Sequence, residues 1–232
     1  MSAEAGPSTD EEPSADTRLG TGDRLAAQLR HAPALPRGFF ARPPVVVARE
    51  LIGSILVDDR PMGLVAARIV EVEAYDGPED RASHARAGKT ARTATMFGPP
   101  GHAYVFLVYG IHHCLNVVTG QDGEAGAVLL RAAAPVEGIA VMRERRGRPH
   151  EADWRLAAGP GRLGAAFAID RRLDGADLTA GPLRLVGADV LSSASVAGAV
   201  VAGPRVGVVY AGEPWSSLAW RFHLRGDPSV SR

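Results

Sequence analysis

Short apolar runs alternate with turn residues along the chain from Phe39 onward, without any repeat of 20 to 50 residues that would indicate a solenoid or a propeller. Helices are predicted at residues 45–52, after two prolines, and at 136–146 and 162–169. Strands are predicted at 55–57, 66–75, 102–108, 111–118, 127–133, 183–186, 205–209 and 219–225. This order lacks a regular βαβ alternation, so it favours one α+β domain over a doubly wound parallel fold.

The strand at 66–75 and the pair of strands around Tyr109 carry the features of most chemical interest. Period-two alternation puts Glu71, Glu73 and Tyr75 on one face of their strand, with a carboxylate beside an aromatic ring. Tyr109 and Gly110 separate two β-prone runs and predict a tight hairpin turn with an exposed tyrosine at its tip.

The first 35 residues show no apolar periodicity and are rich in Pro, Ser, Ala, Gly and acids. Such a segment buries too little apolar surface to order itself, so we expect a disordered tail at 1–35 and a domain at 36–232. The whole chain has 26 basic and 26 acidic residues, and five of the acids fall in the first 16 residues, which hold no Lys or Arg. The remainder therefore carries a net charge of +5. All of its basic residues except Lys89 are arginines, whose guanidinium groups suit forked contacts with phosphate.

Composition excludes several classes of protein. A content of 46% hydrophobic and 22% charged residues is ordinary for a globular domain. No window offers the roughly 18 unbroken apolar residues of a membrane span, and the acidic N-terminus lacks the layout of a secretory signal. The single cysteine, Cys114, permits no internal disulfide and no cysteine-rich zinc site, which favours a reducing, cytoplasmic location.

Two motifs with possible ligands have simpler explanations. Residues 159–164 fit G-x-G-x-x-G, but the preceding segment is a poor strand and Pro160 lacks an N–H, so a glycine-rich helix start is favoured over a dinucleotide site. His112 and His113 are neighbours on a strand and point to opposite faces, so they predict no metal site. The only lysine, Lys89, lies in a polar loop, which disfavours a Schiff-base mechanism.

The segment after Glu73 adds many ordered matches to one family. The chain closely resembles the alkyladenine (3-methyladenine) DNA glycosylases from about Phe39 to its C-terminus. The strings that carry the resemblance are VEAYDGPEDRASH, MFGPPGHAYVFLVYGIHHCLNV, VLLRAAAPVEG, GPGRLGAAFAID, RVGVVYAGEPW and WRFHLRGDPSVS. The resemblance implies a single α+β domain with a curved, largely antiparallel sheet flanked by helices and a protruding β-hairpin.

The resemblance also assigns roles to particular positions. Glu73 matches the catalytic carboxylate that activates a water, and Arg131 matches a residue that supports this water. Glu71 is expected to be structural. Tyr109 matches the wedge that fills the gap left in the DNA when the damaged nucleotide swings out.

The base pocket is expected to contain Tyr75, His84 and Phe106 as stacking positions, with Asn116 obstructing the exocyclic amine of normal guanine. Phe106 replaces the tyrosine often found at its position, so a hydrogen bond from that hydroxyl is lost. The phosphate contacts are expected from a basic loop that contains Arg86, Lys89 and Arg92.

The sequence thus predicts a monofunctional DNA glycosylase that hydrolyses the glycosidic bond of alkylated purines, with deaminated purines as a further class, and leaves an abasic site. The expected partner is damaged double-stranded DNA in the nucleoid, bound by a monomer without metal or cofactor. Two alternatives stay open: a non-catalytic protein that binds damaged DNA, and, more remotely, a nucleotide-dependent enzyme that uses the glycine-rich turn.

Overall fold

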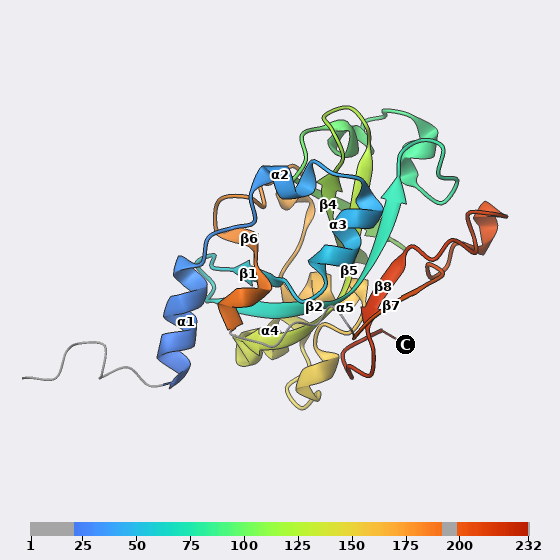
Figure 1. The fold of residues 1–232 in the computed structure, drawn as a ribbon. Helices are drawn as coiled ribbons and strands as arrows, with labels where there is room; N and C mark the ends of the chain where they lie inside the picture. The colour runs from blue at the N-terminus through green and yellow to red at the C-terminus, as the bar shows by residue number, and fades with distance from the viewer. Residues whose placement is uncertain (1–20, 192–198, 232) are drawn as a thin grey trace, which may run out of the picture.

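The computed structural model describes residues 21–191 and 199–231 (Figure 1). Its strands form one antiparallel sheet in the order β3-β4-β5-β2-β1-β6, and β8 joins β2 and also pairs with β7. The strands are β1 (Ile55–Asp58), β2 (Val65–Asp76), β3 (Ala103–Val108), β4 (His112–Thr119), β5 (Gly126–Glu137), β6 (Leu183–Val186), β7 (Val200–Gly203) and β8 (Arg221–Leu224). The α+β class and the antiparallel sheet are therefore confirmed.

The two long strands β2 and β5 form the centre of the sheet. Their pairing is interrupted by register shifts between Ile69 and Val72, and β2 bends along its length (Figure 1). Because a bulge adds a residue to one strand and increases its local twist, these shifts re-aim the side chains that follow. The bend therefore lies immediately before the segment of β2 that carries Glu73 and Tyr75.

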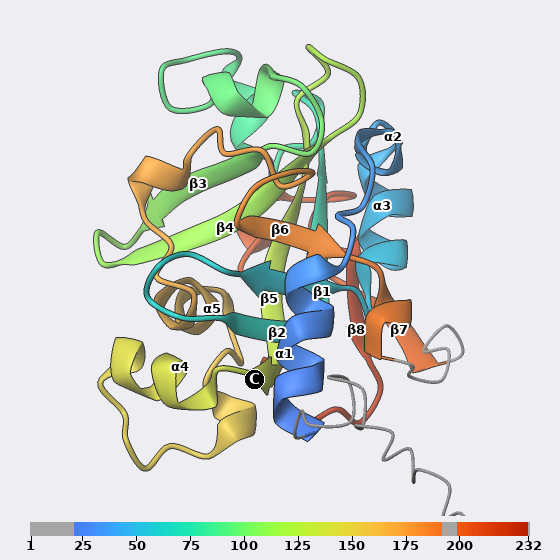
Figure 2. The same cartoon turned by 90° about the vertical axis from the view of Figure 1, so that its left-hand side faces the viewer.

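In the part of the chain that the structure describes, five α-helices surround the sheet: α1 (Thr21–His31), α2 (Arg37–Phe40), α3 (Pro44–Leu51), α4 (Ile139–Arg146) and α5 (Pro160–Ala166). Helix α3 packs against β2 and β5, and α5 packs against β4 and β5. In Figure 2, α3 and α5 lie on opposite sides of these strands. No helix of the described residues is long and apolar enough to cross a membrane.

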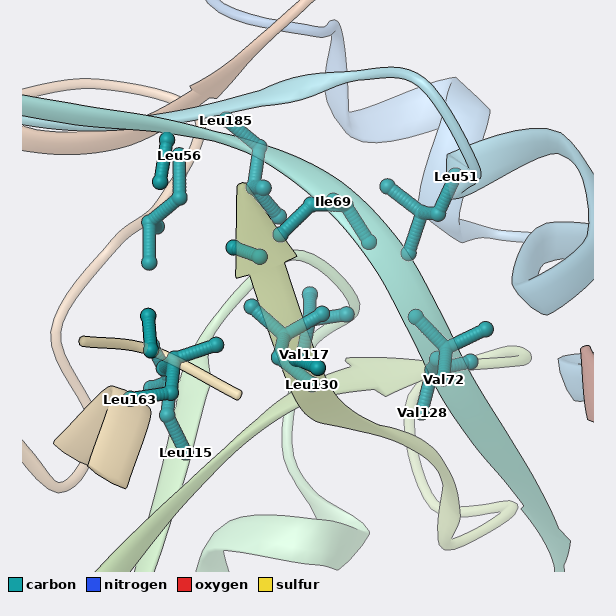
Figure 3. Packing of buried hydrophobic residues seen from close by; sticks show 14 of the residues in the cluster. Leu51, Leu56, Ile69, Val72, Leu115, Val117, Val128, Leu130, Leu163 and Leu185 are labelled. Carbon is teal, nitrogen blue, oxygen red and sulfur yellow. The ribbon is translucent and has the colours of Figure 1, made fainter. Parts of the chain in front are cut away.

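A continuous apolar cluster joins the helices to the sheet (Figure 3). Its labelled members are Leu51, Leu56, Ile69, Val72, Leu115, Val117, Val128, Leu130, Leu163 and Leu185. Full burial of a side chain of this size contributes about 1.5–3 kcal/mol, so the cluster holds β2, β4 and β5 as a firm scaffold for the polar groups at their ends.

The predicted hairpin between β3 and β4 is confirmed. Val108 pairs with His112, and the three intervening residues form the loop, with a positive φ at Tyr109 (51°) and Gly110 (71°). Glycine adopts such angles easily, whereas tyrosine does so rarely. The Tyr109 side chain is 89% exposed and that of Ile111 71%, so the turn presents two large apolar groups to solvent.

The prediction of a disordered tail is wrong for residues 21–31. Residues 21–31 form helix α1, and Leu29 is fully buried against Ile55, Val57 and Val186 of the sheet. The helix is one short amphipathic stretch, and the prediction missed it because the composition of the surrounding residues, rich in Pro and Ala, is typical of disorder. Residues 1–20, where the rest of the expected tail falls, lie outside the described residues.

One predicted strand is also wrong. Residues 205–209 form a loop that leads into a 3-10 turn at Val209–Ala211, and the strand that pairs with β8 is β7, five residues earlier. Pro204 and Gly207, with a φ of 75°, interrupt the valine-rich pattern, and the Arg205 side chain points into the protein. The helix predicted at 136–146 starts only at Ile139, because Gly138 (φ 73°) ends β5 there.

Candidate active site and nucleic-acid interface

Strand β2 brings two carboxylates, Glu71 and Glu73, into the interior of the protein, and both are fully buried. In the register with β5, Glu73 lies opposite Leu129 and Glu71 opposite Ala132. A buried carboxylate is stable only where charges or hydrogen bonds replace its lost water. The surroundings of each group therefore decide what it can do.

Glu73 lies in a polar cluster within this interior. Its Oε1 accepts a hydrogen bond from the backbone N–H of Val206 at 2.6 Å and lies 3.2 Å from Nη1 of Arg131. Its Oε2 accepts a hydrogen bond from the Tyr75 hydroxyl at 2.8 Å. Burial and the neighbouring charge of Glu73 raise the pKa of Tyr75 well above its ordinary value, so the tyrosine remains a neutral donor.

Arg131 of β5 joins the two carboxylates. Its Nε donates to Glu71 at 2.9 Å while its Nη1 faces Glu73. Glu71 also accepts hydrogen bonds from Nε of Arg221 at 2.6 Å and from the backbone N–H of Ser231 at 2.7 Å. Burial alone would raise the pKa of Glu71, but the charge of Arg131 and these hydrogen bonds outweigh burial and lower the pKa.

A pocket lies beside Tyr75 and Val206, the two residues that donate hydrogen bonds to Glu73. It is lined by Tyr75, Ala82, His84, Met96, Tyr104, Phe106, Asn116, Ala127, Leu129, Val206, Gly207, Val208 and Tyr210. The rings of His84 and Phe106 meet edge to face with their centroids 4.5 Å apart. The aromatic lining suits a flat, ring-shaped ligand.

The structure thus brings together all four residues predicted for the base pocket, Tyr75, His84, Phe106 and Asn116, on the wall of one cavity. Asn116 is buried, and its Nδ2 donates to the backbone carbonyl of Tyr104 at 3.0 Å. This hydrogen bond fixes the orientation of the amide at the cavity wall.

Behind Tyr75 lies a fully buried arginine that sequence reasoning missed. Arg205 donates to both carboxylate oxygens of Asp80, with Nη2 at 2.9 Å from Oδ1, and the side chains of both residues are 0% exposed. The Arg205 guanidinium also lies 4.8 Å from the centroid of the Tyr75 ring and 5.1 Å from that of Trp220. Arg205 therefore anchors the Tyr75 ring and the backbone that leads to Val206.

The three basic residues expected to contact phosphate all lie on the exposed surface near the pocket. Arg86 and Arg92 line a shallow hollow together with His84, and Lys89 lies on the same loop. Arg92 differs from the other two because its Nη2 lies 3.1 Å from Nε2 of His84.

A second, larger basic hollow was not foreseen. Arg131 forms part of its wall, and the hollow is otherwise lined by His112, Arg146, Arg148, Glu151, Trp154, Arg155, Ala158, Gly159, Pro160, Gly161, Arg162, Val230 and Ser231. Two of its arginines, Arg146 and Arg148, belong to the basic run RERRGR at 143–148, and the others come from separate elements between β5 and α5 that meet only in the folded protein. Through Arg131, the ion-pair partner of Glu73, the hollow presents positive charge at the surface.

The glycines of the G-x-G-x-x-G motif have a packing role in this hollow. A Cβ built on Gly164 would lie 2.1 Å from the carbonyl oxygen of His113, and one on Gly161 would lie 2.8 Å from the His112 ring. Because these glycines have no side chain, α5 approaches β4 closely at the end of the strand next to the hairpin turn. No group of three His, Cys, Asp or Glu side chains that could hold a metal ion occurs within residues 21–191 and 199–231.

The hairpin presents apolar groups to solvent, arginines line surface hollows, and the aromatic pocket contains the two residues, Tyr75 and Val206, that donate to the buried Glu73. These features fit the class of enzymes that act on a ring turned out of a larger polyanion. Comparison with known proteins identifies the family within this class. The family model of methylpurine-DNA glycosylase matches residues 38–228, and the chain belongs to this family.

Curated relatives match over most of their length, and three of them carry the same name, "Putative 3-methyladenine DNA glycosylase". The protein of Methanocella arvoryzae is 47% identical over 203 residues, which cover 86% of this chain and 96% of the relative. That of Anaeromyxobacter dehalogenans strain 2CP-1 is 51% identical over 199 residues, 85% of each chain. That of Streptomyces avermitilis is 47% identical over 200 residues, 85% of this chain and 90% of the relative.

Proposed function

We propose that this protein removes alkylated purines from double-stranded DNA by hydrolysing the bond between base and sugar, and so begins base excision repair. The observation that carries the proposal is the position of Glu73, a buried acceptor that is held by the Val206 N–H and Arg131 and whose donors Tyr75 and Val206 line an aromatic pocket. Membership of the methylpurine-DNA glycosylase family and the names of the relatives support the same activity.

The damaged nucleotide must first leave the helix, at a cost of a few kcal/mol of stacking and pairing. Tyr109 is our candidate for the wedge that fills the vacated space, because it is 89% exposed at the tip of a hairpin whose strands belong to the main sheet. Because the main sheet already holds the hairpin in place, Tyr109 can enter the minor groove without a prior folding step.

The extruded base then occupies the aromatic pocket. Alkylation at a ring nitrogen makes a purine electron-poor, and stacking on an aromatic ring is worth about 1–3 kcal/mol per base. Tyr75, His84 and Phe106 supply these rings. Asn116, fixed by its hydrogen bond to Tyr104, is the candidate that obstructs the exocyclic amine of normal guanine.

Glu73 acts in this proposal as the general base. It accepts a proton from a water whose oxygen forms a bond with the anomeric carbon, while the electron pair of the glycosidic bond leaves with the base. Arg131, whose Nη1 lies 3.2 Å from Oε1, places a positive charge beside this carboxylate. General-base assistance of this kind accelerates a reaction by roughly 10²- to 10⁴-fold.

The DNA backbone runs over the two basic hollows that flank this pocket. Arg86 and Lys89 are candidates on one side, and Arg146, Arg155 and Arg162 on the other. Contacts of this type position the duplex without reading its sequence. We further propose that one monomer suffices and that it acts on nucleoid DNA in the cytoplasm, because the pocket and both hollows belong to one chain.

The test is the variant Glu73→Gln. The amide can still accept from the Val206 N–H and can donate to the Tyr75 oxygen, so the fold and the affinity for lesion-containing duplex should persist. Base release in single turnover, measured as alkali-labile sites over a panel of duplexes with one modified purine each, should fall at least 100-fold, the low end of the general-base range.

Glu50→Gln, which changes an exposed carboxylate on α3, is the matched control and should keep the wild-type rate. Undiminished release by Glu73→Gln would exclude the proposed base. A wild-type protein that binds lesion duplexes tightly but releases no base from any of them would instead support a non-catalytic binder.

A further inference from the structure

Arg92 makes a contact that a simple phosphate-binding residue does not need. Its Nη2 lies 3.1 Å from Nε2 of His84, and on the other side of the ring Nδ1 lies 2.9 Å from the Tyr104 hydroxyl. A guanidinium can only donate hydrogen bonds, so Nε2 must be the acceptor and carry no proton. A neutral imidazole has one N–H, which therefore lies on Nδ1 and is donated to Tyr104.

We infer that Arg92 is a specificity-determining residue, which holds His84 as the neutral Nδ1–H tautomer and so keeps this wall of the pocket uncharged toward a cationic purine. This inference rests on the proposed function, because it concerns the bases that the same pocket accepts. A purine alkylated at N3 or N7 of its ring carries a positive charge. An imidazolium in the pocket would repel such a base, whereas a neutral ring can stack on it.

The surroundings of His84 support a neutral ring. Burial, and secondly the charge of Arg92, lower the pKa of His84 to about 4. Arg92 and the Tyr104 hydroxyl contact its two nitrogens, and Phe106 packs at 4.5 Å. The adjoining hollow contributes the side chains of Arg81, Arg86 and Tyr210 and, among the described residues, no carboxylate that would stabilise an imidazolium.

Arg92 itself lies on the exposed surface, where water and salt screen its charge from the pocket. The imidazole, in contrast, lines the pocket directly. The Arg92 guanidinium at the surface therefore prevents an imidazolium from forming at His84 in the pocket wall. Arg86 lies on the same loop, is also exposed, and has no hydrogen bond from its side chain within the described part of the chain, so it offers a matched control.

The first test does not depend on catalysis. Long-range ¹H–¹⁵N NMR of the imidazole in the free protein should find the proton of wild-type His84 on Nδ1 and a neutral ring down to about pH 4. Arg92→Ala should shift the midpoint upward and populate both tautomers, Arg92→Lys should restore most of the wild-type pattern, and Arg86→Ala should leave it unchanged. A wild-type proton on Nε2, or an unchanged titration in Arg92→Ala, would overturn the inference.

The second test compares base release from duplexes with 7-methylguanine, which is cationic, and with hypoxanthine, which is neutral, between pH 5.5 and 8. For Arg92→Ala, the ratio of the cationic to the neutral rate, divided by the same ratio for the wild type, should drop about two- to tenfold from pH 8 to pH 5.5, because burial still lowers the pKa of His84 from its ordinary 6.5. An equal loss in the rate of base release on both substrates at every pH would instead indicate that Arg92 only contacts phosphate, and would overturn the inference. Failure of the wild type to release any base would refute the proposed function, and the NMR titration would still decide the tautomer.

Discussion

Removal of the Arg205 guanidinium, for example by Arg205→Met, should be among the most damaging single changes in this protein. The side chains of Arg205 and Asp80 are both 0% exposed, and the variant would leave the Asp80 carboxylate, among the described residues, with the backbone N–H groups of Asp76 and Ala82 as its remaining donors. Breaking a buried ion pair by removal of one partner costs about 3–5 kcal/mol, because an uncompensated charge stays behind. A typical domain has a total stability of only about 5–15 kcal/mol.

Urea denaturation followed by far-UV circular dichroism at pH 7 measures this cost as a change in the free energy of unfolding. The matched control is Arg172→Met, since Arg172 also pairs with an aspartate, Asp170, but its side chain is 90% exposed. Water screens an exposed pair of this kind, so Arg172→Met should leave the free energy of unfolding close to the wild-type value.

A second variant separates the stranded charge from the lost packing. Arg205→Met combined with Asp80→Asn removes both charges, so it should recover part of the loss, with a coupling energy of about 0.5–3 kcal/mol. An Arg205→Met protein that unfolds within 1 kcal/mol of the wild type would refute the reasoning. The reasoning would also be refuted if the double variant lost more free energy of unfolding than the two single variants lose together.

Two further variants test the proposed contacts with DNA. Tyr109→Ser should weaken binding of lesion duplex more than it slows base release from single-stranded substrate, where no gap needs filling; an equal loss in both assays would count against the wedge. Phe106→Ala should weaken binding of the damaged base by about 1–3 kcal/mol in fluorescence anisotropy, the value of one stacking contact. Leu107→Ala, at the exposed neighbour on β3, should leave it unchanged, and a similar loss in both variants would exclude stacking on Phe106.

Local patterns in the sequence predicted the elements that hold the site. The positions of Glu73 and Tyr75 on one face of β2 follow from the period of a strand, and the Tyr109 turn follows from the two β-prone runs around it. The resemblance to a family added His84, Phe106 and Asn116, which come from three different segments and meet only in the folded protein. Their meeting in one cavity required the tertiary structure.

The features that the sequence did not reveal depend on distant partners. Arg205 is 125 residues from Asp80, so no spacing rule links them. The valine-rich segment around Arg205 has strand propensity, but the buried ion pair and Gly207 (φ 75°) hold it as a loop over the pocket. Tertiary contacts therefore overrode local preference where the loop delivers the Val206 N–H to Glu73.

The pair of glutamates on β2 shows why the proposed base needs a second carboxylate beside it. Arg131 could form a two-pronged ion pair with Glu73 alone, and such a contact would occupy the oxygen lone pairs that a general base requires. Glu71, held by Arg221 and by the Ser231 N–H, binds Nε of Arg131 and thereby turns only Nη1 toward Glu73. Glu71 thus takes the hydrogen bonds of Arg131 Nε and Arg221, whereas Oε2 of Glu73 accepts, within the described part of the chain, from the Tyr75 hydroxyl alone and so has a lone pair left for a water.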